Sequence, residues 1–261
     1  MSPRLRKYIK LLQTPASWPA LRHGVAATLE HDSALAGDSF VTVIDVGANK
    51  GQFAVYARIR WPKAQLICFE PLPEPRAKLQ RVTGGQTKIY DCALGAEPGE
   101  GRMHLATRTD SSSLLALGAR QKAIFGMEAS GEFQVPIKRL DACISTPLTR
   151  PTLLKIDVQG FELEVLKGAT DLLPHIDAVY VEVSYVELYE GQALHEEIER
   201  FLTEAGFRLD GRYNTHVHQG ESVQADLLFR RAPIPSDITR AGSKVTPSTQ
   251  SSGQGNRIRV L

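Results

Sequence analysis

Between residues 41 and 229, short apolar runs alternate with segments of helical periodicity, and this alternation constrains the fold more than any other feature of the chain. The β-branched run 41–46 ends at a glycine and predicts a buried strand. The apolar stripe over 52–60 predicts a helix that stops at Pro62. Strands that alternate with helices form a mostly parallel sheet covered on both faces. The sequence therefore predicts a doubly wound α/β fold.

The alternation continues along the chain. We expect further strands at 66–69, 87–90, 153–156, 178–183, 207–209 and 227–229, and further helices at 74–82, 162–173 and 192–205. Residues 97–150 interrupt the pattern and form an insert, in which segments 102–106 and 133–137 can pair as extra strands. The stretch between these two segments is Ser-rich and can form a helix.

Two terminal segments fall outside the alternation. Residues 1–40 form a predicted helical extension, which begins with a short basic amphipathic helix at 1–13. Such a helix most commonly covers the main domain, and a weak contact with an anionic membrane surface is the alternative. Residues 232–261 are rich in Pro, Ser, Thr and Gly and predict a flexible tail. The predicted domain therefore spans residues 41–231.

The net charge is only +2, with 31 Lys and Arg against 29 Asp and Glu. Residues 1–40 hold five basic and three acidic side chains, and residues 232–261 hold four and one. The remaining 22 basic and 25 acidic side chains give the central domain a net charge of −3. This distribution argues against a protein dedicated to binding nucleic acid.

The cysteines and the apolar runs predict a cytoplasmic protein. Cys68, Cys92 and Cys143 are far apart and lack the Cys-x-x-Cys spacing of a metal or redox site, which fits a reducing compartment. No segment has the pattern of a secretory signal peptide or the length of an apolar membrane span.

A glycine turn follows the first predicted strand, with the sequence Asp45-Val-Gly47-Ala-Asn49-Lys-Gly51. A turn of this kind lets backbone approach a ligand at the N-terminus of the next helix. Because only two glycines are present, the turn does not match the dinucleotide fingerprint, and this disfavours a nicotinamide-dependent oxidoreductase. Asp45 suits a ligand with a cationic end, such as the amino acid end of S-adenosylmethionine.

The next two predicted strands also end in acids. Glu70 lies 19 residues after Gly51, where doubly wound folds place the carboxylate that binds a ribose diol. Asp91 ends the third strand, just before Ala93, where an adenine edge would lie. A helix cap or a solvated turn is the alternative for either acid alone. Three consecutive strand ends at one crevice favour a ligand site.

Lys155, Asp157 and Glu182 are the candidates for catalysis. Lys155 and Asp157 lie on the same face of the fourth predicted strand, and Glu182 ends the fifth. One interpretation of Lys155 and Asp157 is a structural ion pair; the other places them beside the reacting groups of a catalysed reaction. Such a reaction requires alignment of the reacting groups and a base. Asp157 and Glu182 both suit substrate orientation and proton acceptance, and the sequence does not distinguish them.

Taken in order, these motifs resemble the FkbM family of S-adenosylmethionine-dependent methyltransferases. The segments that carry the resemblance are DVGANKG at 45–51, FEP at 69–71, ALG at 93–95, LKIDVQGFE at 154–162, LKG at 166–168 and QAD at 224–226. The resemblance spans about residues 41–230 and implies a class I, Rossmann-like methyltransferase with a seven-stranded sheet and an antiparallel last strand. It also implies O-methylation, often of sugar hydroxyls in glycolipids, polysaccharides or secondary metabolites.

The resemblance assigns roles to the strand-end residues. The methionine end of the cofactor would lie against Asp45, Gly47, Asn49 and Gly51, the ribose would bind Glu70, and the adenine would lie near Asp91 and Ala93. On the catalytic interpretation, Lys155 and Asp157 would lie beside the transferred methyl group and the acceptor hydroxyl. A domain that binds S-adenosylmethionine without catalysis is the remaining alternative. No metal is expected: His216 and His218 are predicted in a polar loop and make a weak candidate pair. The expected partner is a small-molecule or glycan acceptor, and the oligomeric state is left open.

Overall fold

The structure is a computed structural model that describes residues 13–232 of the chain. The amphipathic helix expected at 1–13 and the tail expected at 232–261 lie outside these residues, apart from one residue each. No helix among residues 13–232 has both the length and the apolar character needed to cross a bilayer.

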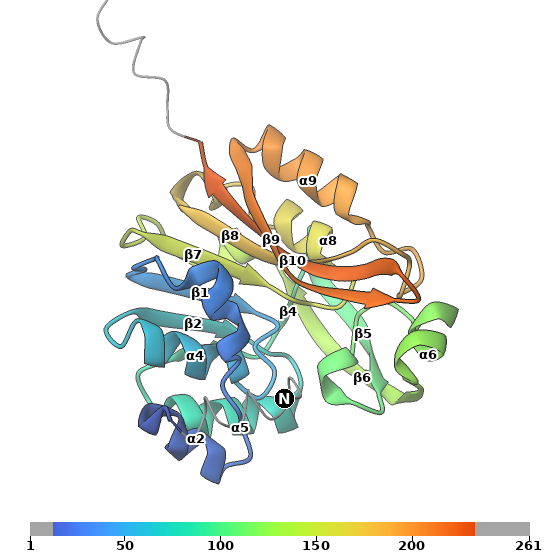
Figure 1. Cartoon of the computed structure of the whole chain (residues 1–261), viewed down its shortest axis with the longest axis horizontal. Coiled ribbons are helices and arrows are strands. Elements are labelled where there is room, and N and C mark those ends of the chain that lie inside the picture. The colour runs from blue at the N-terminus through green and yellow to red at the C-terminus, as the bar shows by residue number, and fades with distance from the viewer. Residues whose placement is uncertain (1–12, 233–261) are drawn as a thin grey trace, which may run out of the picture.

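A seven-stranded sheet forms the centre of the fold, in the order β3-β2-β1-β7-β8-β10-β9 (Figure 1). Its strands are β1 (Thr42–Val46), β2 (Gln65–Phe69), β3 (Lys88–Tyr90), β7 (Thr152–Ile156), β8 (Ala178–Ser184), β9 (Phe207–His218) and β10 (Glu221–Arg231). The first five pair in parallel, and β10 runs antiparallel to both of its neighbours. This confirms the doubly wound, mostly parallel sheet with an antiparallel last strand.

Helices cover both faces of the sheet. The α-helices are α2 (Trp18–Arg22), α3 (Asp32–Leu35), α4 (Gln52–Arg60), α5 (Pro73–Thr83), α6 (Ala119–Phe125), α7 (Leu140–Cys143), α8 (Glu162–Lys167) and α9 (His195–Glu204). Short 3₁₀ helices lie at η1 (Pro15–Ser17), η2 (Leu29–His31), η3 (Thr109–Ser111) and η4 (Leu173–His175). Helices α4 and α5 lie on one face, and α8 and α9 lie on the other (Figure 1).

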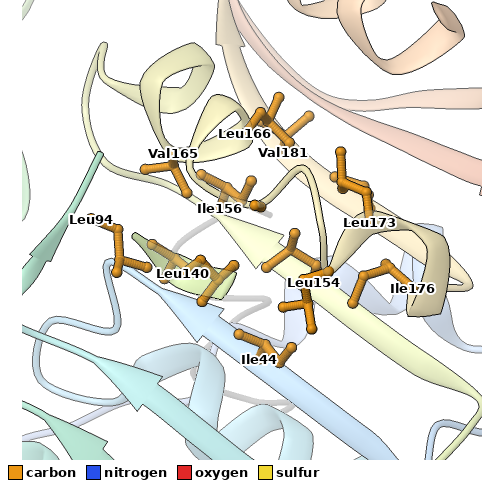
Figure 2. Packing of buried hydrophobic residues seen from close by; sticks show 14 of the residues in the cluster. Ile44, Leu94, Leu140, Leu154, Ile156, Val165, Leu166, Leu173, Ile176 and Val181 are labelled. Atoms are coloured by element: carbon orange, nitrogen blue, oxygen red, sulfur yellow. The ribbon is translucent and has the colours of Figure 1, made fainter. Parts of the chain in front are cut away.

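Alternation along the strands supplies two cores. In β1, Val43 packs with α4 and α5, whereas Ile44 packs with α8 and α9. Figure 2 shows Ile44 together with Leu154 and Ile156 of β7, beside Leu166 of α8. The described part of the N-terminal extension shares the α4–α5 core through apolar residues of α2, η2 and α3.

The insert and the residues just before it form a second, three-stranded sheet with the order β4-β6-β5. Its strands are β4 (Ala93–Leu94), β5 (Gly99–Ala106) and β6 (Ala129–Lys138). The expected pairing is confirmed, because Arg102 of β5 lies opposite Gln134 of β6 in an antiparallel register. Ser113 ties the insert to the main sheet, since its hydroxyl donates to the carbonyl of Gln159 at 2.6 Å.

Three expected elements differ from the structure. The helix predicted over 162–173 is shorter and ends at Lys167. The apolar residues that follow have the spacing of a helix, but they lie in a turn and in η4, where they pack against the sheet. The strands predicted at 207–209 and 227–229 are much longer, because β9 and β10 form a hairpin around Gln219 and Gly220, both with positive φ. His216 and His218 therefore lie in strand β9, and the polar loop expected there was wrong.

Candidate active site

The turn after β1 brings backbone into a cavity at the carboxyl edge of the sheet. Gly47 has a φ of +78°, and a Cβ on it would lie 1.9 Å from the carbonyl oxygen of Asp157. Only glycine fits where this turn touches the segment after β7. Asn49 also has a positive φ, of 47°. We call this space the first cavity; it is lined by His31, Val46–Asn49, Gln52, Phe53, Phe69–Leu72, Cys92–Leu94, Met103, Asp110, Ser112, Leu114, Lys155, Asp157–Gln159 and Phe161.

Gly51 has a different role from Gly47. It begins helix α4 with a φ of +92°, and a Cβ on it would lie 2.9 Å from Leu79 of α5. Gly51 therefore lets α4 and α5 pack closely and does not line the first cavity.

Glu70 lies at the end of β2 with its carboxylate in the first cavity and only 6% of the residue exposed. One carboxylate oxygen accepts the backbone N–H of Asn49 at 2.9 Å, and the other accepts that of Leu72 at 2.8 Å. Burial raises the pKa of Glu70 to about 7, although both backbone N–H groups act to lower it. Each oxygen keeps a second acceptor position for a ligand.

Lys155 joins two acids at the centre of the sheet. Its Nζ lies 3.3 Å from Oδ1 of Asp45 and 3.5 Å from Oδ2 of Asp157. Asp45 faces Lys155 directly across the β1–β7 pair and is 1% exposed. Burial raises the pKa of Asp45, and it would lower that of Lys155, but the neighbouring carboxylates raise the pKa of Lys155 above its usual value. The expected ion pair is present, and it includes Asp45, which does not line the first cavity.

The third strand end contributes only in part. Ala93 lines the first cavity together with the apolar side chains of Phe69, Leu72 and Met103. Asp91 is exposed and is absent from the lining. The structure thus places Ala93, but not Asp91, in the first cavity with Gly47, Asn49 and Glu70.

A second cavity adjoins the first. It is lined by Glu30, His31, Phe125, Asp157, Glu182, Asn214, His216, Gln224, Ala225 and Asp226. His31 and Asp157 line both cavities. Among residues 13–232, no three His, Cys, Asp or Glu side chains are grouped to hold a metal ion.

Glu182 lies in the second cavity and is held by two amides. Its Oε2 accepts the side-chain N–H groups of Gln159 at 2.9 Å and of Gln224 at 3.1 Å. Burial raises the pKa of Glu182 well above its usual value, and the charges of Asp157 and Asp226 act in the same direction.

Sequence reasoning missed several residues of the second cavity. Asp226 belongs to one of the resembling segments but was not among the predicted site residues, and neither were its partners Asn214 and Tyr180. His31 comes from the N-terminal extension, and no local pattern indicates that its ring reaches the sheet. Long-range packing alone brings these side chains together.

A family model described as "Methyltransferase FkbM domain" matches residues 45–209 of the chain. The 2-O-methyltransferase NoeI of Sinorhizobium fredii is 28% identical over 245 residues, which cover 90% of this chain and 94% of that protein. The 31-O-demethyl-FK506 methyltransferase FkbM of Streptomyces tacrolimicus is 31% identical over 64% of this chain and 70% of its own length. The hexuronic acid methyltransferase AglP of Haloferax volcanii is 29% identical over 53% of this chain and 54% of its own length.

Proposed function

Because this chain belongs to the FkbM family of S-adenosylmethionine-dependent methyltransferases, we propose that it methylates a hydroxyl group of an uncharged sugar or a similar polyol. Membership of a methyltransferase family argues against the two alternatives, which were a nicotinamide-dependent oxidoreductase and a domain that binds S-adenosylmethionine without catalysis. The observation that carries the choice of acceptor is the second cavity, whose polar lining consists of carboxylates, amides and histidines. Two of the three relatives have names with an O-methyl designation, which agrees with a hydroxyl acceptor, whereas the third is named for a hexuronic acid, which is an anionic sugar.

The donor set of the first cavity fits the cofactor. Glu70 offers one acceptor position on each carboxylate oxygen, as two neighbouring ribose hydroxyls require. Leu72, Ala93 and Met103 provide an apolar wall for the adenine, and Gly47 and Asn49 would hold the methionine end. When bound, S-adenosylmethionine supplies a methyl group on a positively charged sulfur.

The ionisation of Glu70 predicts a pH dependence of cofactor affinity. With a pKa of about 7, Glu70 is an acceptor for both hydroxyls above that pH and becomes a protonated, weaker acceptor below it. We expect the Kd of S-adenosylhomocysteine to rise by about tenfold between pH 8 and pH 6, since each pKa unit corresponds to a factor of ten. Isothermal titration at both pH values measures this change.

The matched control is Glu70→Gln, which cannot ionise. Its affinity for S-adenosylhomocysteine is expected to be weaker than that of the wild type at pH 8 and nearly constant between pH 8 and pH 6. An equal pH dependence in both proteins would remove Glu70 from the ribose site.

The second cavity suits hydroxyl-bearing, uncharged molecules. Asp157, Glu182 and Asp226 provide acceptors for hydroxyl groups, and Gln224 and Asn214 provide amides. At the wall, the rings of Phe125 and His216 lie 4.9 Å apart, where they can contact the C–H face of a sugar ring. Among residues 13–232, no Lys or Arg lines this cavity. Lys155 balances Asp157 from outside this cavity, but an anionic acceptor would meet carboxylates and no cation to pair with inside it.

The three catalytic candidates enter the proposal with different tasks. Lys155 holds Asp157 where the two cavities meet, because its Nζ lies between that carboxylate and Asp45. Asp157 and Glu182 orient the acceptor through hydrogen bonds to its hydroxyls. Alignment of the hydroxyl oxygen with the methyl group is the main contribution that these side chains make.

Acceptor charge gives a direct test of the proposed function. We expect methyl transfer from S-[methyl-³H]adenosylmethionine to be at least about tenfold faster, as kcat/KM, for methyl glycosides of glucose, galactose and mannose than for the corresponding uronic acid glycosides. Each pair differs only at C6, so that ring size and hydroxyl configuration are matched. Consistent preference for the uronates would contradict an uncharged acceptor, and no transfer to any glycoside by a protein that binds the cofactor would contradict a simple sugar acceptor.

A further inference from the structure

The side-chain amide of Gln159 bridges two carboxylates where the two cavities meet. Its Nε2 donates to Oδ1 of Asp157 at 2.8 Å and to Oε2 of Glu182 at 2.9 Å. Gln159 lines the first cavity, Glu182 lines the second, and Asp157 lines both. Because both oxygens are within hydrogen-bond distance of one nitrogen, the two carboxylates are close neighbours.

The remaining partner of the amide fixes its orientation. Oε1 of Gln159 accepts the hydroxyl of Tyr189 at 2.7 Å, and that hydroxyl accepts the side-chain N–H of Gln121 at 2.9 Å. A reversed amide would place Oε1 against two carboxylate oxygens, where it has no proton to offer. The two protons of Nε2 are therefore committed, one to each acid.

The backbone at Gln159 is strained and is held from two sides. Its φ of 60° lies in the left-handed region, which a residue other than glycine rarely adopts. Oε1 of Glu162 accepts the backbone N–H groups of Val158 at 3.1 Å and Gly160 at 3.0 Å. From the insert, the hydroxyl of Ser113 donates to the carbonyl of Gln159 at 2.6 Å. Strain that the surroundings maintain in this way is concentrated at functional sites.

The bridge opposes the repulsion between Asp157 and Glu182. The charge of Asp157 raises the pKa of Glu182, in the same direction as burial, and the charge of Lys155 acts against both. Gln224 donates a further N–H to Oε2 of Glu182 at 3.1 Å, but it does not contact Asp157. Among the described residues, Gln159 alone donates hydrogen bonds to both acids. Its amide therefore stabilises the two negative groups side by side.

We propose that Gln159 is a positioning residue of the acceptor site, whose amide holds Asp157 and Glu182 together as hydrogen-bond acceptors for the hydroxyls of the acceptor molecule. This inference rests on the proposed function, in which those two acids orient the acceptor. Gln159 acts through the two acids and takes no part in the bonds that form and break. Glu162 and Ser113 hold the backbone from which its side chain extends.

The first test detects the bridge and needs no acceptor. In the full chain with S-adenosylhomocysteine bound, the two side-chain amide proton signals of Gln159 are assigned by NMR from their loss in Gln159→Met. We expect Asp157→Asn to displace mainly one of these signals and Glu182→Gln mainly the other, because each proton is bonded to one acid. If Gln159→Met does not fold, Gln159→Glu provides the same assignment.

The second test measures turnover on the best glycoside of the acceptor panel. We expect Gln159→Met to lower kcat/KM for the glycoside by about 10–100-fold, the range for a hydrogen bond to a charged group. The Kd of S-adenosylhomocysteine should change by less than about threefold, since Gly47, Asn49 and Glu70 hold the cofactor in the proposed function. A larger change in this Kd than in kcat/KM would assign the Gln159 side chain to cofactor binding and contradict the proposal.

Gln159→Glu provides a readout that a purely structural role would not change. The substitution keeps the shape of the side chain but places a third carboxylate between Asp157 and Glu182. At pH 8 three negative groups meet, whereas at lower pH the new group takes up a proton and can again donate to one acid. We expect the ratio of the wild-type kcat/KM to that of Gln159→Glu to be at least about 100 at pH 8 and to fall by about tenfold at pH 6.

Several elements contribute titratable groups around this position. Interacting charges and hydroxyls come from Lys155, Asp157, Glu162, Glu182, Tyr189 and Asp226, while His31 and Asp110 line the first cavity with Gln159. All of these groups are present in both proteins, so that the ratio of the two kcat/KM values isolates the substitution. Gln86→Glu, exposed and outside both cavities, is the matched control and should keep kcat/KM within about twofold of the wild type at both pH values.

Three further results would overturn the proposal. They are amide proton signals of Gln159 that stay in place in Asp157→Asn and Glu182→Gln, a kcat/KM of Gln159→Met within about threefold of the wild type, and a ratio for Gln159→Glu that does not fall between pH 8 and pH 6. A wild-type protein that methylates no glycoside would contradict the acceptor class of the proposed function. The NMR experiment would still decide whether the amide bridges the two acids.

Discussion

Replacement of Lys155 by methionine is expected to lower the free energy of unfolding by about 3–5 kcal/mol, the usual cost of removing one partner from a buried ion pair. Asp45 is 1% exposed, and neither of its carboxylate oxygens has a hydrogen-bond partner among the described residues. Lys155, at 3.3 Å, is the cation that compensates this charge. Without it, Asp45 must remain charged in the core or take up a proton. Urea unfolding of both proteins measures the loss.

The loss should depend on pH with a definite sign. Burial already raises the folded-state pKa of Asp45, and removal of Lys155 raises it further. An acid whose pKa is higher in the folded than in the unfolded state loses stability as the pH rises from the unfolded value toward the folded value. The gap between Lys155→Met and the wild type should therefore narrow as the pH is lowered toward the usual pKa of an aspartate, about 4.

Two control variants separate burial from charge. Lys167→Met removes an exposed ion pair with Glu164, at 2.7 Å, and should change the unfolding free energy by no more than about 1 kcal/mol. Asp45→Val combined with Lys155→Met replaces both buried charges with apolar side chains and should recover much of the lost stability. A double variant as unstable as Lys155→Met alone would show that the uncompensated charge of Asp45 is not the cause.

The elements that the sequence predicted best are those with local causes. The turn at Gly47 and the helix over 52–60 were predicted from a strand, a turn and an apolar stripe that are contiguous in the chain. Helix α4 has the predicted bounds, 52–60. Glu70 was found for the same reason, since it follows directly after a buried strand. A residue next to a strand end is placed at the carboxyl edge of a parallel sheet whatever the rest of the chain does.

Side-chain direction was less predictable than position along the chain. Asp45, one residue before the end of β1, points into the sheet toward Lys155, because the register places the two residues opposite each other. Asp91 follows β3, the edge strand, and is exposed rather than turned into the first cavity. Register and strand order decide these directions, and neither is encoded in the spacing of a single motif.

The second cavity could not be predicted from local pattern at all. His31 and Asp226 are separated by almost the whole domain, and they meet because η2 packs against α4 while β10 lies beside β8. From the sequence alone, Tyr180 would be assigned to the core, because it lies in an apolar strand. Its hydroxyl donates a hydrogen bond to Asp226, and it can do so only because β10 lies beside β8. Motifs therefore indicated Gly47, Asn49, Glu70 and Ala93, which line the first cavity, whereas tertiary packing alone forms the second cavity.

The close contact between Gly47 and the backbone of Asp157 predicts the largest effect on cofactor binding. Gly47→Ala introduces a Cβ whose position would be 1.9 Å from the backbone oxygen of Asp157, and the backbone is in the left-handed region. Since the opposing atom is backbone, the end of β1 and the segment after β7 must move apart, and both line the first cavity. We expect the Kd of S-adenosylhomocysteine to rise by at least about 100-fold, because small displacements in a binding site have large effects.

Gly24→Ala is the matched control for this substitution. Gly24 has a φ of +72°, close to that of Gly47, but a Cβ on it would have no heavy atom within 4 Å. It should cost about 1 kcal/mol of unfolding free energy from backbone strain and leave the Kd of S-adenosylhomocysteine unchanged. The difference between the two variants, measured by titration calorimetry and urea unfolding, therefore isolates the contact with Asp157 from the strain that both share. If Gly47→Ala bound the ligand as tightly as Gly24→Ala, the turn could not be the part of the chain that positions the cofactor.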